Sequence, residues 1–241
     1  MKRLIIITLS LLSAFVVFGR TERGQTGKEQ TTESPTSQSL KGWSRTGRHR
    51  ENYYLTVDSK VRRGGRASAT LISKNAASDD GFGSMKQEIK ADDYRGKRLR
   101  YSGYVKTEIG DQPAALWMRV EGDEGKILAF DNMDSRPVKK TTGWKRYEIV
   151  LDVPENALYI ALGALFEGKG QIWVDDLKLE TVGQDTASTD MHASPEVKQE
   201  MEEEDEEYRR THKEDFERAV RQAKERLSTM PTRPVNFDFE N

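Results

Sequence analysis

The stretch GKGQIWVDDLKLE, residues 168–180, has the composition of a buried β-strand that follows a glycine-containing turn. β-Branched, aromatic and aliphatic side chains dominate it, as is typical of strands. Two adjacent acids, Asp175 and Asp176, nevertheless stand in its middle. A carboxylate that leaves water without a partner is costly, so the pair raises the question of what lets a half-buried strand carry it.

Eight further segments between Gly42 and Val182 have the same character, and Gly, Pro, Asp and Asn separate them. They are YYLTVD (53–58), ASATLIS (67–73), GSMKQEIK (83–90), KRLRYSGYVKTE (97–108), AALWMRVE (114–121), KILAFDN (126–132), WKRYEIVLDV (144–153) and LYIALGALFE (158–167). Short strands at this spacing, with no helical segment between them, predict an all-β fold: an antiparallel jelly-roll β-sandwich.

Several segments alternate with a period of two, which assigns their residues to faces. Leu116, Met118 and Val120 are predicted to point inward, so Trp117 and Arg119 point outward. The same reasoning places a second set inward, namely Leu99, Tyr101, Gly103, Val105, Tyr147, Ile149, Leu151 and Val153. The segment 158–167 is apolar on both faces, which predicts a central strand.

The two ends of the chain differ in composition from this middle part. Residues 1–19 carry Lys2 and Arg3 before an apolar run, the pattern of a secretory signal; an uncleaved N-terminal anchor is the alternative. Residues 20–40 read as a polar linker and 41–182 as the sandwich. We therefore expect a secreted or periplasmic protein, and the lack of cysteine excludes disulfides and lipid attachment through a cysteine.

Beyond the sandwich, residues 183–193 read as a second linker and 194–230 as one charged α-helix with Ser194 as N-cap. Its apolar stripe is thin, so the helix is expected to dock or pair weakly, as a short coiled coil, a homo-oligomer contact or a site for a protein partner. Residues 231–241 contain VNFDFEN, which alternates like a strand. The net charge of −1, the acidic block at 200–208 and the predicted export argue against nucleic acid as a partner.

Four stretches resemble a known family: RGGRASATLIS (63–73), YRGKRLRYSGYVKTE (94–108), LWMRVEG (116–122) and the long run 142–180. They look like the galactose-binding-like sandwich of CenC-type carbohydrate-binding modules, in the versions appended to bacterial regulators and peptidases. The resemblance runs from Gly42 to Val182. It implies a jelly-roll fold and a non-catalytic glycan-binding role.

The resemblance also implies a structural calcium ion. In that family the ion lies between a glutamate of an opening N-x-x-F-E strand, backbone oxygens of a G-G-x-x-S-like stretch and an aspartate of the last strand. Here the opening strand is missing before Gly42, and a similar motif stands at 236–240. Either the C-terminal segment folds back to complete the sandwich, or it is the first strand of a second module.

By this reasoning Ca²⁺ is the expected cofactor, with Asp175 and Glu240 as side-chain ligands and backbone carbonyls near Gly64 and Gly65. Asp175 is assigned the inward phase of Trp173, Leu177 and Leu179, and Asp176 the outward phase. The alternative is that both aspartates lie at the surface beside Lys169 or Lys178.

An enzyme is not expected. His49, His192 and His212 fall in a loop, a linker and a polar helix, and no nucleophile, zinc or phosphate-binding motif is found. Acidic residues such as Glu88, Glu148 and Glu167 occur often enough to form pairs by chance.

Binding is the better hypothesis, on an exposed face of the sandwich. An exposed tryptophan stacks on sugar rings, and Arg and Glu side chains satisfy hydroxyl groups. Alternatively, Trp117 is a second layer of core, and Trp173 is assigned to the core. The predicted ligand-binding residues are Trp117, Arg119, Tyr104, Lys106 and Arg146, with Asp131 at the rim.

The sequence thus predicts an exported, non-catalytic module that binds a glycan or another component of the cell envelope, with no membrane span beyond the signal. The alternative is a structural protein that assembles through the sandwich and the acidic helix and has no sugar site.

Overall fold

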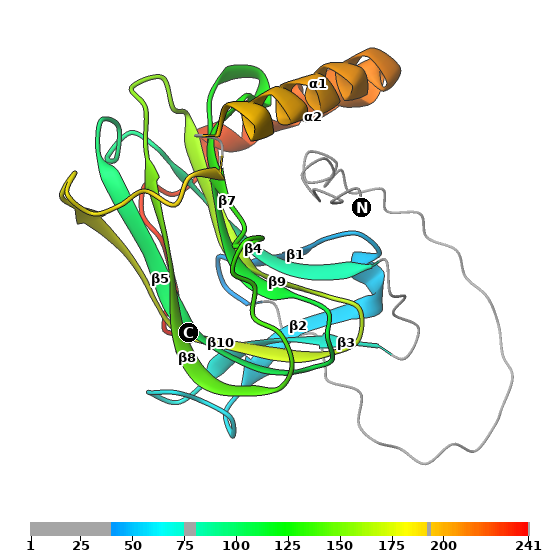
Figure 1. The fold of residues 1–241 in the computed structure, drawn as a ribbon, viewed down its shortest axis with the longest axis vertical. Helices are drawn as coiled ribbons and strands as arrows, with labels where there is room; N and C mark the ends of the chain where they lie inside the picture. Colours follow the sequence, from blue (N-terminus) through cyan, green and yellow to red (C-terminus); the bar gives the residue numbers. More distant parts are fainter. Residues whose placement is uncertain (1–39, 75–80, 192–193, 241) are drawn as a thin grey trace, which may run out of the picture.

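The computed structural model describes residues 40–74, 81–191 and 194–240, and it shows a two-layered β-sandwich with a pair of helices at one end (Figure 1). The predicted signal and nearly all of the first linker lie outside the described residues. The first sheet has the order β1-β4-β9-β6-β7 and the second the order β2-β3-β10-β5-β8. Every strand pair is antiparallel, which confirms the predicted sandwich.

The strands are β1 (Ser44–Thr46), β2 (Tyr53–Asp58), β3 (Ser68–Ser73), β4 (Phe82–Lys90), β5 (Arg98–Ile109), β6 (Ala114–Glu121), β7 (Ile127–Asp131), β8 (Thr142–Asp152), β9 (Tyr159–Glu167) and β10 (Gly170–Val182). Two short 3₁₀ helices, η1 (Arg50–Asn52) and η2 (Asp123–Gly125), lie in loops. All nine predicted strands are present. The structure has one further strand, β1, which has only three residues and is therefore too short for a period-two alternation to be recognised.

The core forms between the two sheets as the alternation predicts. Leu99, Tyr101 and Val105 of β5 and Leu116, Met118 and Val120 of β6 are fully buried. The strand that is apolar on both faces, β9, is the middle strand of the first sheet, and β10 is the middle strand of the second. A central strand has neighbours on both edges and layers on both faces, which accounts for its composition.

The predicted single helix 194–230 is wrong in one respect, because the structure contains two helices, α1 (Pro195–Thr211) and α2 (Lys213–Thr229). His212, with φ −129° and ψ 41°, breaks the helical path. α1 ends and α2 begins on either side of His212, and both helices lie at one end of the sandwich (Figure 1); we call this pair the helical hairpin. In the described part of the chain, no helix combines the length and the apolar character that a membrane span requires.

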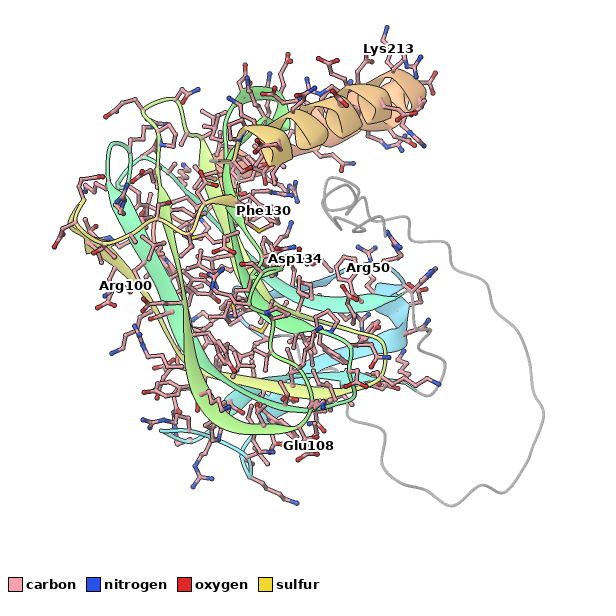
Figure 2. The ribbon with its side chains drawn as sticks, viewed as in Figure 1. Arg50, Arg100, Glu108, Phe130, Asp134 and Lys213 are labelled. Carbon is pink, nitrogen blue, oxygen red and sulfur yellow. The ribbon has the colours of Figure 1, made fainter. Side chains whose placement is uncertain are left out.

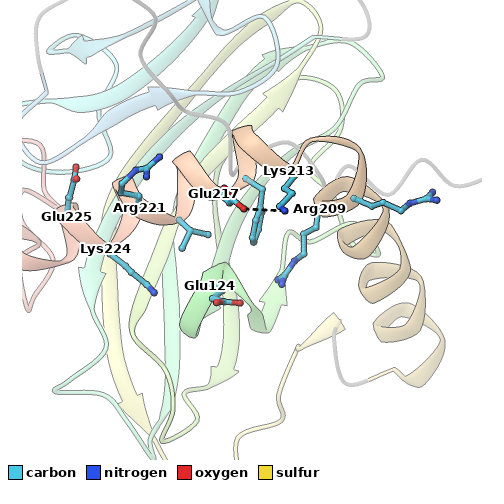
Figure 3. Close-up of a pocket in the computed structure, with 10 residues that line it drawn as sticks. Glu124, Arg209, Lys213, Glu217, Arg221, Lys224 and Glu225 are labelled. Carbon is cyan, nitrogen blue, oxygen red and sulfur yellow. Dashed lines mark ion pairs between the residues drawn. The ribbon is translucent and has the colours of Figure 1, made fainter.

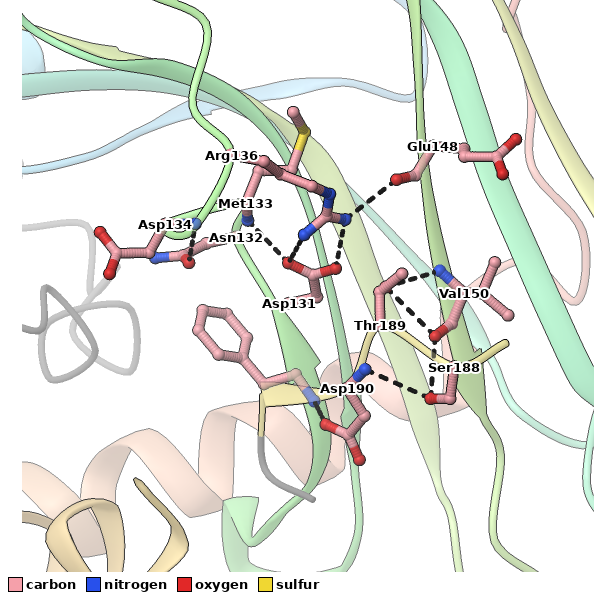
Figure 4. A network of polar contacts seen from close by, with 11 residues as sticks. Asp131, Asn132, Met133, Asp134, Arg136, Glu148, Val150, Ser188, Thr189 and Asp190 are labelled. Atoms are coloured by element: carbon pink, nitrogen blue, oxygen red, sulfur yellow. Dashed lines mark hydrogen bonds and ion pairs between the residues drawn. The ribbon is translucent and has the colours of Figure 1, made fainter. Parts of the chain in front are cut away.

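The segment between β10 and α1 is tied to the sandwich. Thr189 Oγ1 accepts a hydrogen bond from Val150 N at 2.9 Å, and Asp190 Oδ1 accepts one from Phe130 N at 2.9 Å (Figure 4). Residues 183–191 therefore follow the edge strands β8 and β7 to the base of the hairpin.

The C-terminal segment 231–240 packs against the sandwich but forms no strand by hydrogen-bond pattern. Phe239 is 2% exposed, and its ring lies 5.7 Å from that of Trp43. Of the two alternatives from the sequence, this arrangement corresponds to a segment that folds back on its own sandwich.

Candidate functional site

A β-bulge explains how β10 carries two aspartates. Asp175 pairs with Tyr104 and Lys178 with Ser102, so β10 has one more residue than β5 across this interval. Asp176 is the extra residue, and its backbone adopts the left-handed conformation, with φ +50°. A bulge interrupts the ladder and changes which residues face the core on either side of it.

The bulge corrects the predicted phase. Ile172 and Val174 before it, and Leu177 after it, pack in the main core. Trp173 is buried but lies on the outer face, where Lys106 Nζ stands 3.9 Å from its ring centroid and Asp58 accepts its indole N–H. Trp173 is therefore not part of the core between the sheets, and Asp175 does not share an inward phase with Leu177.

Peptide N–H groups hold the Asp175 carboxylate. Its Oδ2 accepts hydrogen bonds from Arg63 N at 2.7 Å and Gly64 N at 3.2 Å, and its Oδ1 accepts one from Asp176 N at 2.8 Å. Burial raises the pKa of Asp175, while these three donors oppose the rise. The buried carboxylate thus has hydrogen-bonding partners, which answers the question that the sequence raised.

The Glu240 carboxylate is held in the same way by the next part of the same loop. Its Oε1 accepts a hydrogen bond from Arg66 N, and its Oε2 forms an ion pair with Arg66 Nε at 2.6 Å. These contacts hold the pKa of Glu240 below its ordinary value. Gly65 has φ +55°, and a Cβ there would lie 2.1 Å from Glu240 Oε1, so only glycine fits.

These contacts do not fit a calcium ion. Calcium requires six to eight oxygen ligands. The loop 63–67 instead turns N–H groups toward Asp175 and Glu240. Among the described residues, no group of three or more His, Asp or Glu side chains is arranged to hold a metal. Calcium stays a prediction from the resemblance, and Gly64 contributes a donor here.

The expectation that the predicted ligand-binding residues share one face is wrong. Trp117 and Arg119 lie on β6 and Asp131 on β7, in the first sheet. Tyr104, Lys106 and Arg146 lie on β5 and β8, in the second. Figure 2 shows this division: Arg100 and Glu108 project from the β5 side, while Phe130 and Asp134 lie on the side below the hairpin. The outer faces of two packed sheets point in opposite directions.

On the first sheet, Trp117 is not available to a ligand. It is 6% exposed, and its indole nitrogen donates to Ser84 Oγ at 3.0 Å. This geometry agrees with the alternative that Trp117 forms a second packed layer.

The polar residues beside Trp117 are paired with one another. Arg119 Nε donates to Glu121 Oε1 at 2.6 Å, and Tyr159 donates to the other oxygen of the same carboxylate. Lys86 Nζ donates to Glu88 Oε1 at 2.7 Å. Arg119 is 5% exposed and Glu121 is fully buried, so this network stabilises the fold and offers few free groups to a solute.

Asp131 is also structural (Figure 4). It is fully buried, and both of its carboxylate oxygens accept hydrogen bonds from Arg136, at 3.1 and 2.6 Å. Arg136 also donates to the carbonyl oxygen of Glu148 at 3.0 Å. The Asp131–Arg136 pair therefore connects the first sheet to β8 of the second, and Asp131 does not lie at a rim.

The outer face of the second sheet has a different character, because its side chains surround a pocket of about 430 Å³. We call it the Tyr104 pocket; its lining residues are Arg63, Ser102, Tyr104, Arg146, Asp176, Lys178 and Glu180. Tyr104 and Arg146 are direct partners across β5 and β8. Of the predicted ligand residues, the structure brings these two into one pocket and places Lys106 two residues further along β5.

Charges of both signs line this pocket and are open to solvent. The Arg63 guanidinium lies 4.3 Å from the centroid of the Tyr104 ring, and its Nη1 lies 3.8 Å from Asp176 Oδ2. Arg146 pairs with Glu148 at 2.7 Å. About two-fifths of each of these charged side chains is exposed. Sequence reasoning missed Arg63, Asp176, Lys178 and Glu180 because the bulge and a distant loop place them.

A second open pocket lies on the helical hairpin and η2 (Figure 3). Its apolar floor contains Phe216 and Val220 of α2, and Lys213 pairs with Glu217 at 4.0 Å. The other lining residues are Glu124, Arg209, Arg210, Arg221, Lys224 and Glu225. Cations outnumber acids in this pocket.

No family model matches the chain. The chain is 39% identical over 165 residues to a Bacillus subtilis protein, the uncharacterized HTH-type transcriptional regulator YbfP. The alignment covers 68% of this chain and 56% of YbfP, so the chain spans a little over half the length of this relative.

Among solved structures, the chain is similar to the xylan-binding domain of carbohydrate-binding module family 22, with 12% identity, 61% of this chain and 90% of that domain covered, and a TM-score of 0.46. For the module TmCBM61, solved with β-1,4-galactotriose, the values are 15%, 59%, 90% and 0.41. For the active domain of tailspike protein 4 of bacteriophage CBA120 they are 14%, 60%, 20% and 0.46. At these values the likenesses carry no argument about a ligand, and the fold rests on the strand pairing described above.

Proposed function

We propose that the chain is a non-catalytic binding module whose Tyr104 pocket holds a glycan or another polar component of the cell envelope. One observation carries the proposal: an aromatic ring, three cations and two carboxylates from β5, β8, β10 and the loop 59–67 converge on one open pocket. Among the residues that the structure describes, no aliphatic side chain lines it.

The chemistry of this lining suits a ligand rich in hydroxyl or charged groups. Tyr104 contributes an aromatic ring and a hydroxyl group, and guanidinium groups such as Arg146 bind oxygen pairs through two parallel hydrogen bonds. Asp176 and Glu180 accept hydrogen bonds from ligand hydroxyls.

The proposal also places the ligand outside the cytoplasm. Residues 1–19 have the pattern of a secretory signal, which favours a ligand outside the cytoplasm. The relative YbfP is named as a transcriptional regulator, and the aligned region covers 56% of its length.

Affinity electrophoresis through gels that contain xylan, galactan or wall teichoic acid tests the proposal. We expect retardation of the wild type by one of these polymers and its loss in Tyr104→Ala and Arg146→Ala. Tyr54→Ala is the matched control, because Tyr54 also carries a cation, Lys74, at 4.6 Å but lies outside the pocket. Retardation that survives both pocket substitutions would disprove the site.

Protein assembly is a second candidate function, favoured by the pocket of Figure 3, where half-buried Phe216 and Val220 meet cations on the hairpin. Such a surface fits an acidic, apolar segment of another protein. Phe216→Asp should abolish co-purification of a specific partner through the hairpin and leave polysaccharide retardation unchanged. Loss of retardation instead would assign the hairpin to glycan binding.

A further inference from the structure

The sandwich recognises its own C-terminal segment, residues 231–240, mainly through the segment's main chain. Gln87 pairs with Val235 in both directions, because its amide nitrogen donates to Val235 O at 2.9 Å and its amide oxygen accepts from Val235 N at 2.8 Å. Lys90 N donates to Pro231 O at 2.8 Å, and Leu177 N donates to Phe237 O at 3.3 Å. This is the way in which proteins bind extended peptides.

Aromatic side chains add a second kind of contact. The rings of Phe237 and Phe239 lie 5.8 and 5.7 Å from the Trp43 ring, and Trp43 Nε1 donates to Asn236 O at 3.1 Å. Close packing continues beside the rings, since a Cβ on Gly42 would lie 2.2 Å from Val235 Cγ2. We call the surface of the sandwich that holds residues 231–240 the groove. Its shape fits this segment closely.

The end of the segment is held by the loop 65–67. Arg66 contacts Glu240 with its backbone N–H and with its guanidinium, and Ala67 N lies 3.4 Å from Glu240 Oε1. The groove therefore contacts, in order along the segment, the extended main chain, the two aromatic rings and the acidic side chain of Glu240.

All of these partner groups belong to the sandwich, between Gly42 and Leu177, and none belongs to the helices that carry the segment. The hairpin itself touches the sandwich through the charge pairs Arg226 with Glu88 at 3.6 Å and Lys224 with Asp123 at 3.5 Å, and through Val197 against Phe130. Residues 231–240 are held by more specific contacts than the helical hairpin that precedes them.

We propose that the groove also accepts residues 231–240 of a second copy of this chain, so that two molecules associate by exchanging C-terminal segments. The occupant seen in the groove is itself the argument: a second copy carries the same segment, and no contact depends on which molecule supplies it. The covalent tether gives the chain's own segment a high effective concentration, so the monomer dominates in dilute solution. Exchange becomes measurable at high protein concentration, or after the segment has left the groove of its own molecule. This inference is independent of the glycan proposal.

Two complementary full-length variants test it. Phe237→Ala/Phe239→Ala weakens the segment and keeps the groove, while Arg66→Ala/Gln87→Ala weakens the groove and keeps the segment. In native mass spectrometry we expect wild-type dimers that increase with concentration, little dimer for either variant alone, and heterodimers when the two are mixed. Far-ultraviolet circular dichroism establishes that each variant is folded. Folded variants that give no heterodimer would overturn the proposal.

A peptide experiment covers the case in which a variant folds poorly. A synthetic peptide of residues 231–240 should raise the Tm of the Phe237→Ala/Phe239→Ala chain, and at high excess it should displace the native segment of the wild type and change Trp43 fluorescence. The same peptide with both phenylalanines replaced by alanine is the control. If the two peptides behave alike on the wild type, the groove does not recognise this segment in trans, and the proposal fails.

Discussion

The indole nitrogen of Trp117 on β6 donates a hydrogen bond to Ser84 Oγ on β4 at 3.0 Å, across the intervening strand β9. The indole crosses at Gly163, the direct β9 partner of both Trp117 and Lys86. A tryptophan that sequence reasoning assigned to a sugar platform is thereby fixed against its own sheet. The pocket proposed to bind a ligand lies on the opposite face, where Tyr104 and Arg146 are direct partners across β5 and β8.

Gly163→Ala should strongly destabilise the fold. A Cβ at this position would lie 1.8 Å from the carbonyl oxygen of Met85 and 3.1 Å from Trp117 Nε1. Because backbone cannot move away as a side chain can, we expect a loss of about 2–4 kcal/mol in the free energy of unfolding. Urea denaturation measures it. Gly143→Ala is the control, since nothing lies within 4 Å of its added Cβ; equal effects at both positions would contradict the close packing described here.

Asp131→Asn should also lower stability, because it removes the charge that pairs with Arg136 inside the protein. Breaking one side of a buried ion pair typically costs about 3–5 kcal/mol, and the partial exposure of Arg136 places the expected loss near the lower end. Thermal denaturation followed by circular dichroism gives the value. Asp134→Asn, at an exposed position in the same loop, should change Tm little. An unchanged Tm for Asp131→Asn would show that the pair contributes nothing.

Glu88 should make the stability depend on pH. Burial alone would raise its pKa, but Lys86, Arg226 and Arg119 hold that pKa below the ordinary value of 4.5. A carboxyl group with a lowered folded-state pKa stabilises the fold above about pH 4.5, and this contribution disappears as the pH falls through the folded-state pKa. The free energies of unfolding of the wild type and Glu88→Gln should therefore differ at pH 7, and the difference should shrink as the pH falls through the folded-state pKa of Glu88. Parallel pH profiles would contradict this linkage.

Calcium should leave the Tm unchanged, because the carboxylates of Asp175 and Glu240 already accept hydrogen bonds from the loop 63–67. A cation that binds only the folded state raises the Tm by mass action, by an amount that grows with its concentration. Differential scanning fluorimetry with calcium and with chelator distinguishes the two cases. A rise in Tm that Asp175→Ala and Glu240→Ala both erase would establish the ion expected from the resemblance and would require the loop to turn its carbonyl oxygens inward.

The strands themselves were predictable, because the period-two alternation of segments such as 97–108 is a local property of the chain. Leu99, Tyr101 and Val105 point inward whatever sheet they join. The bulge in β10 was not predictable, since a single extra residue is visible only against the register of its partner, β5. The error in the phase of Trp173 and Asp175 follows directly from that missing residue.

The amino-acid sequence by itself determined that this protein is an antiparallel β-sandwich with a charged helical extension, because alternation, turn residues and helix capping act over a few neighbouring positions. Only the tertiary structure decided that β5 and β6 belong to different sheets, so that Tyr104 and Trp117 face opposite directions, and that residues 231–240 return to Trp43. Pairing between distant strands depends on contacts among residues far apart in the chain, and no local pattern encodes which outer face a given side chain will share.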